Sequence, residues 1–394
     1  MRDVVIAGAC RTAIGTFGGG LKSFSAIQLG TFVIQEALKR AGVRPEAVDE
    51  VVMGHVLQAG LGENPAHRCS VDAGVPIEVP AFTVNEVWGS GLKAVALGAQ
   101  AIAAGEADIV VAGGMESMTN APYLVGKARW GVSIGDEAFV DSMPHDGLLD
   151  PWTGVHMRVI AENVAEQFGI SRSDQGAVAS ESVRRARHAI DAGHFREEIV
   201  PIEVAERKGP SFVFDTDELP RTRPTPDVMR TRRPAFKKAG TVTAGSASGI
   251  NDGAAAVVLL AAELAEDVGI TPQARVRACA SAGVEPHLMG TGPIAAVLKI
   301  LGRTGLKVGD LGLIESNEAF AAQALAVARM LGFPPEITNV SGGGIALGHP
   351  IGASGCRILV TLVHAMHRLS RRLGLATLCM GGGQGMAMIV DREP

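Results

Sequence analysis

The residue with the clearest potential for proton transfer is His349, in the segment Gly348-His349-Pro350. Pro350 restricts the backbone after the histidine and the glycines favour a tight bend, so a rigid loop sets the direction of the ring. A lone histidine is more often structural, but this one does not lie on an amphipathic face. An imidazole can accept a thiol proton or donate to an oxyanion near neutral pH. We therefore interpret His349 as an acid–base candidate.

Two other segments carry groups that could serve the same reaction. Cys379 ends an expected strand and precedes glycines 381–383, whose bare amides could contact a thioester oxygen or lower the pKa of the thiol. A buried inert thiol is the alternative, and the residues alone leave both interpretations open. Asn317 follows an expected strand and starts an expected helix, so a helix N-cap would explain it without any catalytic task.

A third feature is a turn between an expected strand and an expected helix. The apolar run 79–87 ends in Trp88 and Gly89-Ser90-Gly91, and helix-forming residues follow over 92–104. Such a turn raises one side chain above the sheet edge and directs the first free amides of the helix toward it. This geometry suits a nucleophile. The side chain on the turn is the indole of Trp88, which is neither basic nor nucleophilic.

The elements that must position these residues form two similar series. In the first we expect strands at 4–9, 50–55 and 107–113, helices at 26–41 and 64–73, and the Trp88 unit before the last strand. In the second we expect strands at 274–282 and 311–315, helices at 290–301, 317–331 and 355–369, a strand-like segment at 337–339, a glycine-rich turn at 342–355, and a hairpin of 375–379 with 385–390. Strands separated by helices predict parallel pairing. The shared order suggests an internal duplication.

Residues 119–249 do not fit this repeat. They carry several prolines, an expected helical stretch at 157–188, and a polar region rich in proline and arginine at 210–234. An insertion of this kind usually serves as a lid or an assembly element. The segment 245–249, Gly-Ser-Ala-Ser-Gly, returns the chain to the core.

Composition narrows the class of protein. A chain of 394 residues can form two or three domains, and its net charge of −5 argues against binding to a polyanion such as a nucleic acid. The five cysteines are odd in number and scattered without a CxxC motif, which indicates reduced thiols and no zinc site. We find no signal peptide and no apolar run long enough to span a membrane. We therefore expect a cytoplasmic protein without membrane partners.

The motifs together resemble those of the thiolases, and the resemblance covers essentially the whole chain. It rests on the Trp88 turn, Asn317-Glu318-Ala319-Phe320, Gly348-His349-Pro350 and Cys379-Met380-Gly381-Gly382-Gly383. It implies an α/β thiolase fold in which two duplicated βαβαβαββ halves of five strands each pack face to face, with the site between them. The expected domains are an N-terminal half (1–118 with 250–270), a loop domain that covers coenzyme A (119–249) and a C-terminal half (271–394).

The resemblance also implies roles for single residues. The thiolase pattern has a nucleophilic cysteine where this chain has Trp88, so the nucleophile position is substituted. His349 would activate that nucleophile, and Asn317 would hold a water that partners His349 in an oxyanion hole. Cys379 would be the acid–base thiol, and the amides of Gly381 and residue 88 would form a second oxyanion hole. Residues implied to contact coenzyme A or substrate are Leu148, His156, Met157, Arg221, Ser248, Ala319 and Phe320.

The implied function is acyl transfer between coenzyme A thioesters, without a metal or other cofactor. The segment 122–141 is similar to the tetramer-forming insert of acetoacetyl-CoA thiolases, so the resemblance implies short-chain substrates and a homo-oligomer, a tetramer or a dimer. Trp88 leaves three interpretations open. The chain is a thiolase whose nucleophile has been replaced, or a decarboxylase or hydrolase that needs no acyl-enzyme, or a non-catalytic coenzyme A-binding subunit.

Overall fold

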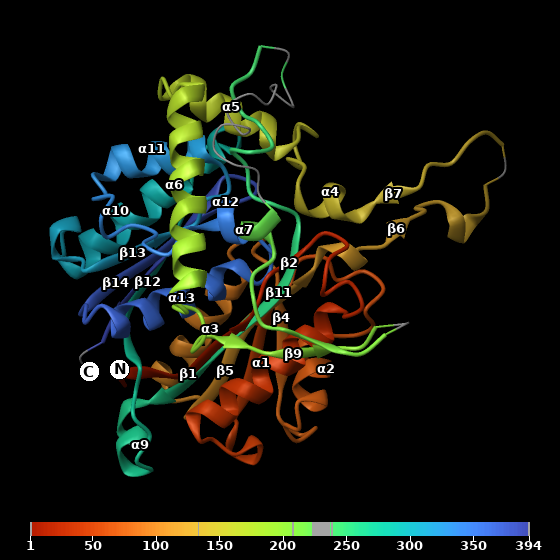
Figure 1. Cartoon of the computed structure of the whole chain (residues 1–394). Coiled ribbons are helices and arrows are strands. Elements are labelled where there is room, and N and C mark those ends of the chain that lie inside the picture. Colours follow the sequence, from red (N-terminus) through yellow and green to blue (C-terminus); the bar gives the residue numbers. More distant parts are fainter. Residues whose placement is uncertain (1, 133, 207–208, 223–236, 238, 393–394) are drawn as a thin grey trace.

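A computed structural model of the chain describes residues 2–132, 134–206, 209–222, 237 and 239–392 (Figure 1). The N-terminal half-sheet has the strand order β1-β11-β5-β3-β4. Its strands are β1 (Val4–Thr12), β3 (Glu50–Gly54), β4 (Ala81–Val84), β5 (Ile109–Ser117) and β11 (Asn251–Ala261). The C-terminal half-sheet has the order β12-β15-β14-β13. Its strands are β12 (Ala274–Gly283), β13 (Leu313–Ser316), β14 (Leu373–Met380) and β15 (Gln384–Asp391).

The pairings of one half recur in the other. Strand β11 lies antiparallel between β1 and β5, as β15 lies antiparallel between β12 and β14. Strand β3 pairs parallel with β5, as β13 does with β14. Within the described residues the fifth strand expected in the C-terminal half is reduced to one parallel bridge, Ile314 to Thr338, where the N-terminal half has the β3–β4 ladder. The prediction of parallel pairing therefore holds for only part of each half-sheet.

Helices fill three layers around these half-sheets. Helices α3 (Ser90–Ala104) and α13 (Ser354–Arg368) pack on each other between the two half-sheets, where residues such as Leu92 and Leu359 are fully buried. Helices α1 (Ala26–Ala41) and α2 (Pro65–Asp72) cover the outer face of the N-terminal half. Helices α10 (Gly292–Thr304) and α11 (Ala321–Leu331) cover that of the C-terminal half. The halves thus lie face to face, and they are also joined at one edge because β1 pairs with β12.

Capping residues explain where the helices begin and end. Helix α1 matches its predicted bounds because Ser25 and Gln28 form a capping box at its start and Gly42 adopts a left-handed conformation at its end. The helical stretch expected at 157–188 forms two helices, α5 (Met157–Gln167) and α6 (Arg172–Asp191). A second capping box, built on Ser171, starts the new helix. The helical pattern of the sequence therefore did not show that the helix is interrupted between Gln167 and Arg172.

The insertion carries two further features. Strands β6 (Tyr123–Leu124) and β7 (Val140–Asp141) form an arm that extends from the body and leads into α4 (Ser142–Gly147) (Figure 1). Strands β8 (Ile199–Val200), β9 (Ile202–Val204) and β10 (Phe212–Phe214) precede the short helix α7 (Leu219–Thr222). Among the described residues, no helix is both long and apolar enough to cross a membrane.

A buried ion cluster fastens the insertion to the core. Arg11 of β1 contacts Glu198 at 2.6 Å and Asp217 at 2.8 Å, and all three side chains are almost completely buried. Removing one charge from such a cluster leaves its partners uncompensated in a low-dielectric region. The cluster therefore holds the two carboxylates of the insertion against β1.

Candidate active site

The Trp88 turn has the predicted strand–turn–helix geometry. Strand β4 ends at Val84, and α3 begins at Ser90. Val87 has a φ of +50°, a left-handed conformation that is unfavourable for a β-branched residue and is typically found at functional sites. The indole of Trp88 is buried, and its Nε1 donates a hydrogen bond to the carbonyl of Gly147 at 3.2 Å. The turn thus points the indole into the protein, toward the insertion.

His349 lies beside this indole. The two ring centroids are 5.5 Å apart and the ring planes meet at 73°, an edge-to-face contact. The backbone amide of His349 donates to the side chain of Asn251 at 2.9 Å, and Asn251 in turn donates to the carbonyl of Gly15 at 2.9 Å. The histidine loop of the C-terminal half is therefore anchored to strand β11 of the N-terminal half.

Hydrogen bonds assign the proton on the imidazole. The hydroxyl of Ser354 donates to the carbonyl of Pro350 at 2.8 Å, so this hydroxyl accepts the hydrogen bond that joins it to Nδ1 of His349. Nε2 is left as the acceptor, and the amide nitrogen of Asn317 lies 3.3 Å from it. Burial, and then the charge of Arg357, lower the pKa of His349 to about 3. The ring is neutral at neutral pH and can accept a proton at Nε2.

Asn317 does not cap a helix. Its backbone amide donates to the carbonyl of Thr377 at 2.9 Å, so Asn317 continues the pairing of β13 with β14. Helix α11 begins at Ala321, with Phe320 at the N-cap position. The N-cap interpretation is therefore wrong. The side-chain oxygen of Asn317 accepts from Arg357 at 3.4 Å, which leaves its amide nitrogen facing His349.

Met380, at the end of β14, and Gly381 after it reach the same turn. An added Cβ atom on Gly89 would lie 2.0 Å from Sδ of Met380, and one on Gly381 would lie 3.3 Å from Cγ1 of Val87. The end of β14 is therefore in direct contact with the Trp88 turn. Cys379 is fully buried, and burial raises the pKa of its thiol to about 12. Desolvation of the thiolate is a larger effect than the backbone hydrogen bond that lowers this pKa.

A narrow cavity adjoins Trp88 and His349. Six of the residues expected to contact substrate line it, namely Leu148, His156, Met157, Ser248, Ala319 and Phe320. Its volume is about 30 Å³, enough for one or two water molecules. Asn317 and Cys379 are not among the described residues that line it. Gly381 lines a separate cavity of about 570 Å³, together with Val87. Arg221 belongs to α7, and its side chain lies outside the described parts of the structure.

Backbone pairing brings the substrate-contact residues together. The segment that returns from the insertion pairs with the start of the Asn317 loop, since Ser248 donates to the carbonyl of Ala319 at 3.0 Å. The amide of Met157 donates to the carbonyl of Leu148 at 2.9 Å. His156 caps α5 through its Nδ1, and burial, with the charge of Arg158, lowers its pKa to about 4. The His156 side chain that lines the cavity is therefore uncharged near pH 7.

Sequence reasoning missed the residues that orient the site. Asn251, Ser354 and Arg357 hold the loop of His349, its ring and the amide of Asn317. Each has a weak signal in the sequence, because a polar side chain lies in an apolar strand or in an apolar helix. Only the structure identifies the partner of each one.

Two family models together match almost the whole chain. A family model described as thiolase, N-terminal domain, matches residues 4–263, and one described as thiolase, C-terminal domain, matches residues 270–392. The chain belongs to the thiolase family.

Individual relatives cover the chain from end to end. The chain is 55% identical over 393 residues to an acetyl-CoA acetyltransferase of Escherichia coli K12, with 100% of each chain covered. It is 53% identical to an acetyl-CoA acetyltransferase of Syntrophomonas wolfei, with 99% of each covered. A crystal structure of the Bacillus anthracis acetyl-CoA acetyltransferase superposes with a TM-score of 0.97 at 42% identity, with 99% of each chain covered.

Proposed function

We propose that this chain has the active site of an acetyl-CoA acetyltransferase in which Trp88 occupies the position of the nucleophile. The observation that supports this most strongly is the contact of the indole with the imidazole, 5.5 Å between centroids, on the turn where α3 begins. Nε2 of His349 lies 3.3 Å from the amide nitrogen of Asn317, and the end of β14, one residue after Cys379, contacts the same turn through Met380. We infer that the chain binds coenzyme A thioesters and forms no acyl-enzyme at residue 88.

A thiol at position 88 would complete a two-step transfer. Nε2 of His349 would take the thiol proton, and the thiolate would attack the thioester carbonyl, while Cys379 would give its proton to the departing coenzyme A and become a thiolate. The thiolate of Cys379 would then remove an α-proton from a second acetyl thioester, whose carbanion would attack the acyl-enzyme. The thiolate expelled from residue 88 would take back the proton held by His349. The product is a 3-oxoacyl thioester, and thiolysis is the reverse. Asn317 and the amide of Gly381 would stabilise the oxyanions.

Trp88 stops this sequence for two physical reasons. Its nitrogen lone pair belongs to the aromatic ring, and its N–H donates to Gly147, so the side chain offers no nucleophile. Its volume also occupies the space beside His349, where only about 30 Å³ remains. Cys379 does not substitute for it, because one thiol would then have to serve as both nucleophile and base.

The proposed substrates are short-chain acyl-CoA thioesters, in line with the names of the relatives and with the narrow cavity. We further propose that the reaction needs no metal or other cofactor, because a thiol and an imidazole supply the required nucleophile and base. A cytoplasmic setting agrees with five cysteines that are all free thiols.

The arm formed by β6 and β7 supports a homotetramer. It and the segment between its strands expose large apolar side chains, namely Tyr123, Trp130, Val132, Ile134 and Phe139. Apolar groups gathered on an extended arm are typical of an assembly contact. Light scattering should give about four times the chain mass, and a monomer at micromolar concentration would contradict the assignment.

The test incubates the chain with acetyl-CoA carrying a radiolabelled acetyl group. We expect labelled ligand to bind in equilibrium dialysis, with no covalent label and no acetoacetyl-CoA. Product without covalent label would instead support a decarboxylase or hydrolase. Failure to bind any coenzyme A thioester would overturn the proposal. The variant Trp88→Cys should acquire both label and turnover, and Trp88→Ser, which is similar in size, should acquire neither.

A further inference from the structure

The end of β5 carries a buried carboxylate that the proposed reaction does not use. Glu116 is fully buried, and its Oε2 accepts hydrogen bonds from the backbone amides of Gly352 at 2.9 Å and Val56 at 3.2 Å. Its Oε1 accepts from the amide of Leu57 at 3.2 Å and lies 3.0 Å from Nε2 of His55, which is also fully buried. A carboxylate is stable in such a place only where donors surround it. The contacts join β5 to two loops that are far apart in the sequence.

One of these two loops carries His349. Gly352 lies three residues after the histidine, and an added Cβ atom on it would lie 2.7 Å from Oε2 of Glu116 and 2.7 Å from the carbonyl oxygen of Met115. Only glycine lets the backbone approach β5 this closely. The amide of His349 is held by Asn251 at 2.9 Å. The loop is thus anchored to the N-terminal half at residue 349 and again at residue 352.

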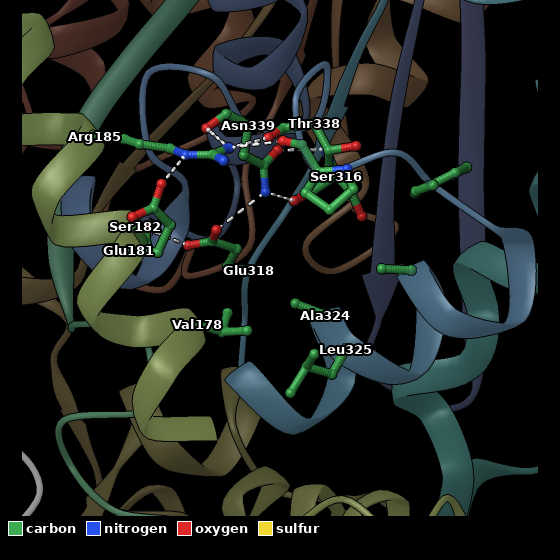
Figure 2. Close-up of a pocket in the computed structure, with 13 residues that line it drawn as sticks. Val178, Glu181, Ser182, Arg185, Ser316, Glu318, Ala324, Leu325, Thr338 and Asn339 are labelled. Carbon is green, nitrogen blue, oxygen red and sulfur yellow. Dashed lines mark hydrogen bonds and ion pairs between the residues drawn. The ribbon is translucent and has the colours of Figure 1, made fainter. Parts of the chain in front are cut away.

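A second buried carboxyl group holds the segment that leads into this loop. Glu318 accepts hydrogen bonds from the hydroxyl of Ser182 at 2.6 Å and the side-chain amide of Asn339 at 3.1 Å (Figure 2), and from the backbone amide of Ile345 at 3.3 Å. Ile345 lies four residues before His349, on the side away from the contact with β5. Carboxyl groups of both halves therefore hold the chain on either side of the imidazole.

The other loop joined to Glu116 reaches the same site. Leu57 and Ile351 pack against Gly147, where an added Cβ atom would lie 3.6 Å from Cδ2 of Leu57 and 2.8 Å from Cδ1 of Ile351. The carbonyl of Gly147 accepts the hydrogen bond of the Trp88 indole, and Ile351 lines the narrow cavity beside it. The hydrogen bonds of Glu116 therefore connect two loops that both border the candidate site.

The duplication gives the contact between β5 and the His349 loop a counterpart. Strand β5 corresponds to β14, because each pairs antiparallel with one neighbour and parallel with the other. The end of β14 meets the Trp88 turn, where an added Cβ atom on Gly89 would lie 2.0 Å from Sδ of Met380. The end of β5 meets the His349 loop at Gly352. Each half thus supports the turn of the other half that carries a candidate site residue.

We propose that Glu116 is a positioning residue for His349. The carboxylate fixes Gly352, and the short turn 349–352 transmits that position to the imidazole. The carbonyl of Pro350 lies inside this turn and accepts from the hydroxyl of Ser354 at 2.8 Å, and the same hydroxyl receives the Nδ1 proton of His349. A displaced turn would therefore move both the ring and the group that sets its tautomer. This inference deepens the proposed function, because it rests on His349 as the base of that site.

The first test follows the ring of His349 in the unmodified chain by ¹⁵N NMR, with the signals assigned by their loss in His349→Asn. The two nitrogens should give well-separated signals, because Nδ1 carries the proton and Nε2 does not. Glu116→Gln replaces one acceptor oxygen by an NH₂ donor, so we expect the two signals to move toward each other as the ring exchanges between tautomers. The matched control Glu162→Gln alters another buried carboxylate, which accepts from the amides of Thr241 and Val242 at 2.8 Å. It should leave the signals unchanged.

A second variant leaves the carboxylate in place and serves if Glu116→Gln does not fold. Glycolic acid incorporated at position 352 turns the amide of Gly352 into an ester and removes only its N–H donor. It should move the His349 signals in the same direction as Glu116→Gln. Unchanged signals in whichever of these variants folds, or an equal change in Glu162→Gln, would overturn the positioning role.

Kinetics in the Trp88→Cys background test the effect on turnover. We expect Glu116→Gln to lower kcat about 10–100-fold while KM changes by less than about twofold, because a displaced base slows proton transfer and leaves the substrate contacts in place. A change in KM alone would contradict the proposal. Inactivity of Trp88→Cys itself would overturn the proposed acyl transfer, and the NMR comparison would still decide the role of Glu116.

Discussion

Replacing Trp88 by cysteine has two opposite consequences that can be estimated from the structure. The indole is 2% exposed and donates one hydrogen bond, to Gly147. Truncating a buried tryptophan typically reduces the free energy of unfolding by about 3–5 kcal/mol, and the retained sulfur places this variant near about 3 kcal/mol. For a chain of 394 residues the transition entropy is roughly 0.8 kcal/mol/K, so the melting temperature should fall by about 4 °C.

The same change should create activity. The thiol would lie beside a neutral imidazole whose Nε2 is a hydrogen-bond acceptor, and the freed space would admit the acyl group. Loss of a catalytic nucleophile typically reduces turnover by about 10⁴-fold or more. We expect Trp88→Cys to exceed Trp88→Ser by a comparable factor in the thiolysis of acetoacetyl-CoA. Intact-protein mass spectrometry should show one added acetyl group on the cysteine variant only.

One result would refute this reasoning. It is a Trp88→Cys variant that folds, as shown by its calorimetric transition, and binds coenzyme A, yet gives neither acetyl adduct nor thiolysis. The indole would then not occupy the nucleophile position, and the proximity of His349 would have no catalytic meaning. Activity in Trp88→Ser equal to that of the cysteine variant would contradict the covalent step in another way.

Three further predictions follow from buried charges and protons. His349 has a pKa of about 3 in the folded chain, against an ordinary value of 6.5. Between these values the ring is protonated in the unfolded chain and neutral in the folded one. The free energy of unfolding therefore falls as the pH is lowered through this window. His349→Asn should reduce that slope in urea unfolding. A slope equal to that of the unmodified chain would contradict the burial of a neutral ring. A second prediction concerns Arg357→Met in the Trp88→Cys background. It should lower kcat roughly 10–100-fold with little change in KM, because Asn317 loses the hydrogen bond that orients its side chain. A change in KM alone would refute the orienting role of Arg357. The third prediction is that Arg11→Met lowers the free energy of unfolding by about 3–5 kcal/mol in denaturant titrations, because the buried carboxylates of Glu198 and Asp217 lose their partner. A loss below about 1 kcal/mol would mean that this cluster does not hold the insertion to the core.

The parts of the fold with local signals could be predicted from the sequence. Helix α1 has a cap at both ends, and its predicted bounds are confirmed. The hairpin of β14 and β15 is also confirmed, because glycines follow its first strand. The place of β11 between β1 and β5 could not be predicted, since its buried apolar pattern identifies a strand and not its neighbours. Strand β1 continues beyond its predicted end at residue 9 because its register shifts after Ala7 and the pairing resumes at Cys10.

Some parts of the candidate site could likewise be predicted from local sequence patterns, and others could not. The bend at His349 and the Trp88 turn have local signals in glycine and proline, and the structure has both features. The task of Asn317 depends on contacts with Arg357 and His349, which are 40 and 32 residues away in sequence. No local pattern encodes such contacts, so a helix cap was an equally good explanation until the fold was known. The roles of the substrate-contact residues rest on the family resemblance and stay predictions.

The most direct test of the central claim is a crystal structure of the unmodified chain with bound acetyl-CoA. We predict that the pantetheine arm lies between Met157 and Ser248 and that the thioester carbon stops against the indole of Trp88, on the side that faces His349. Acetyl-CoA bound elsewhere, or a thioester that reaches Nε2 of His349 past the indole, would contradict the account.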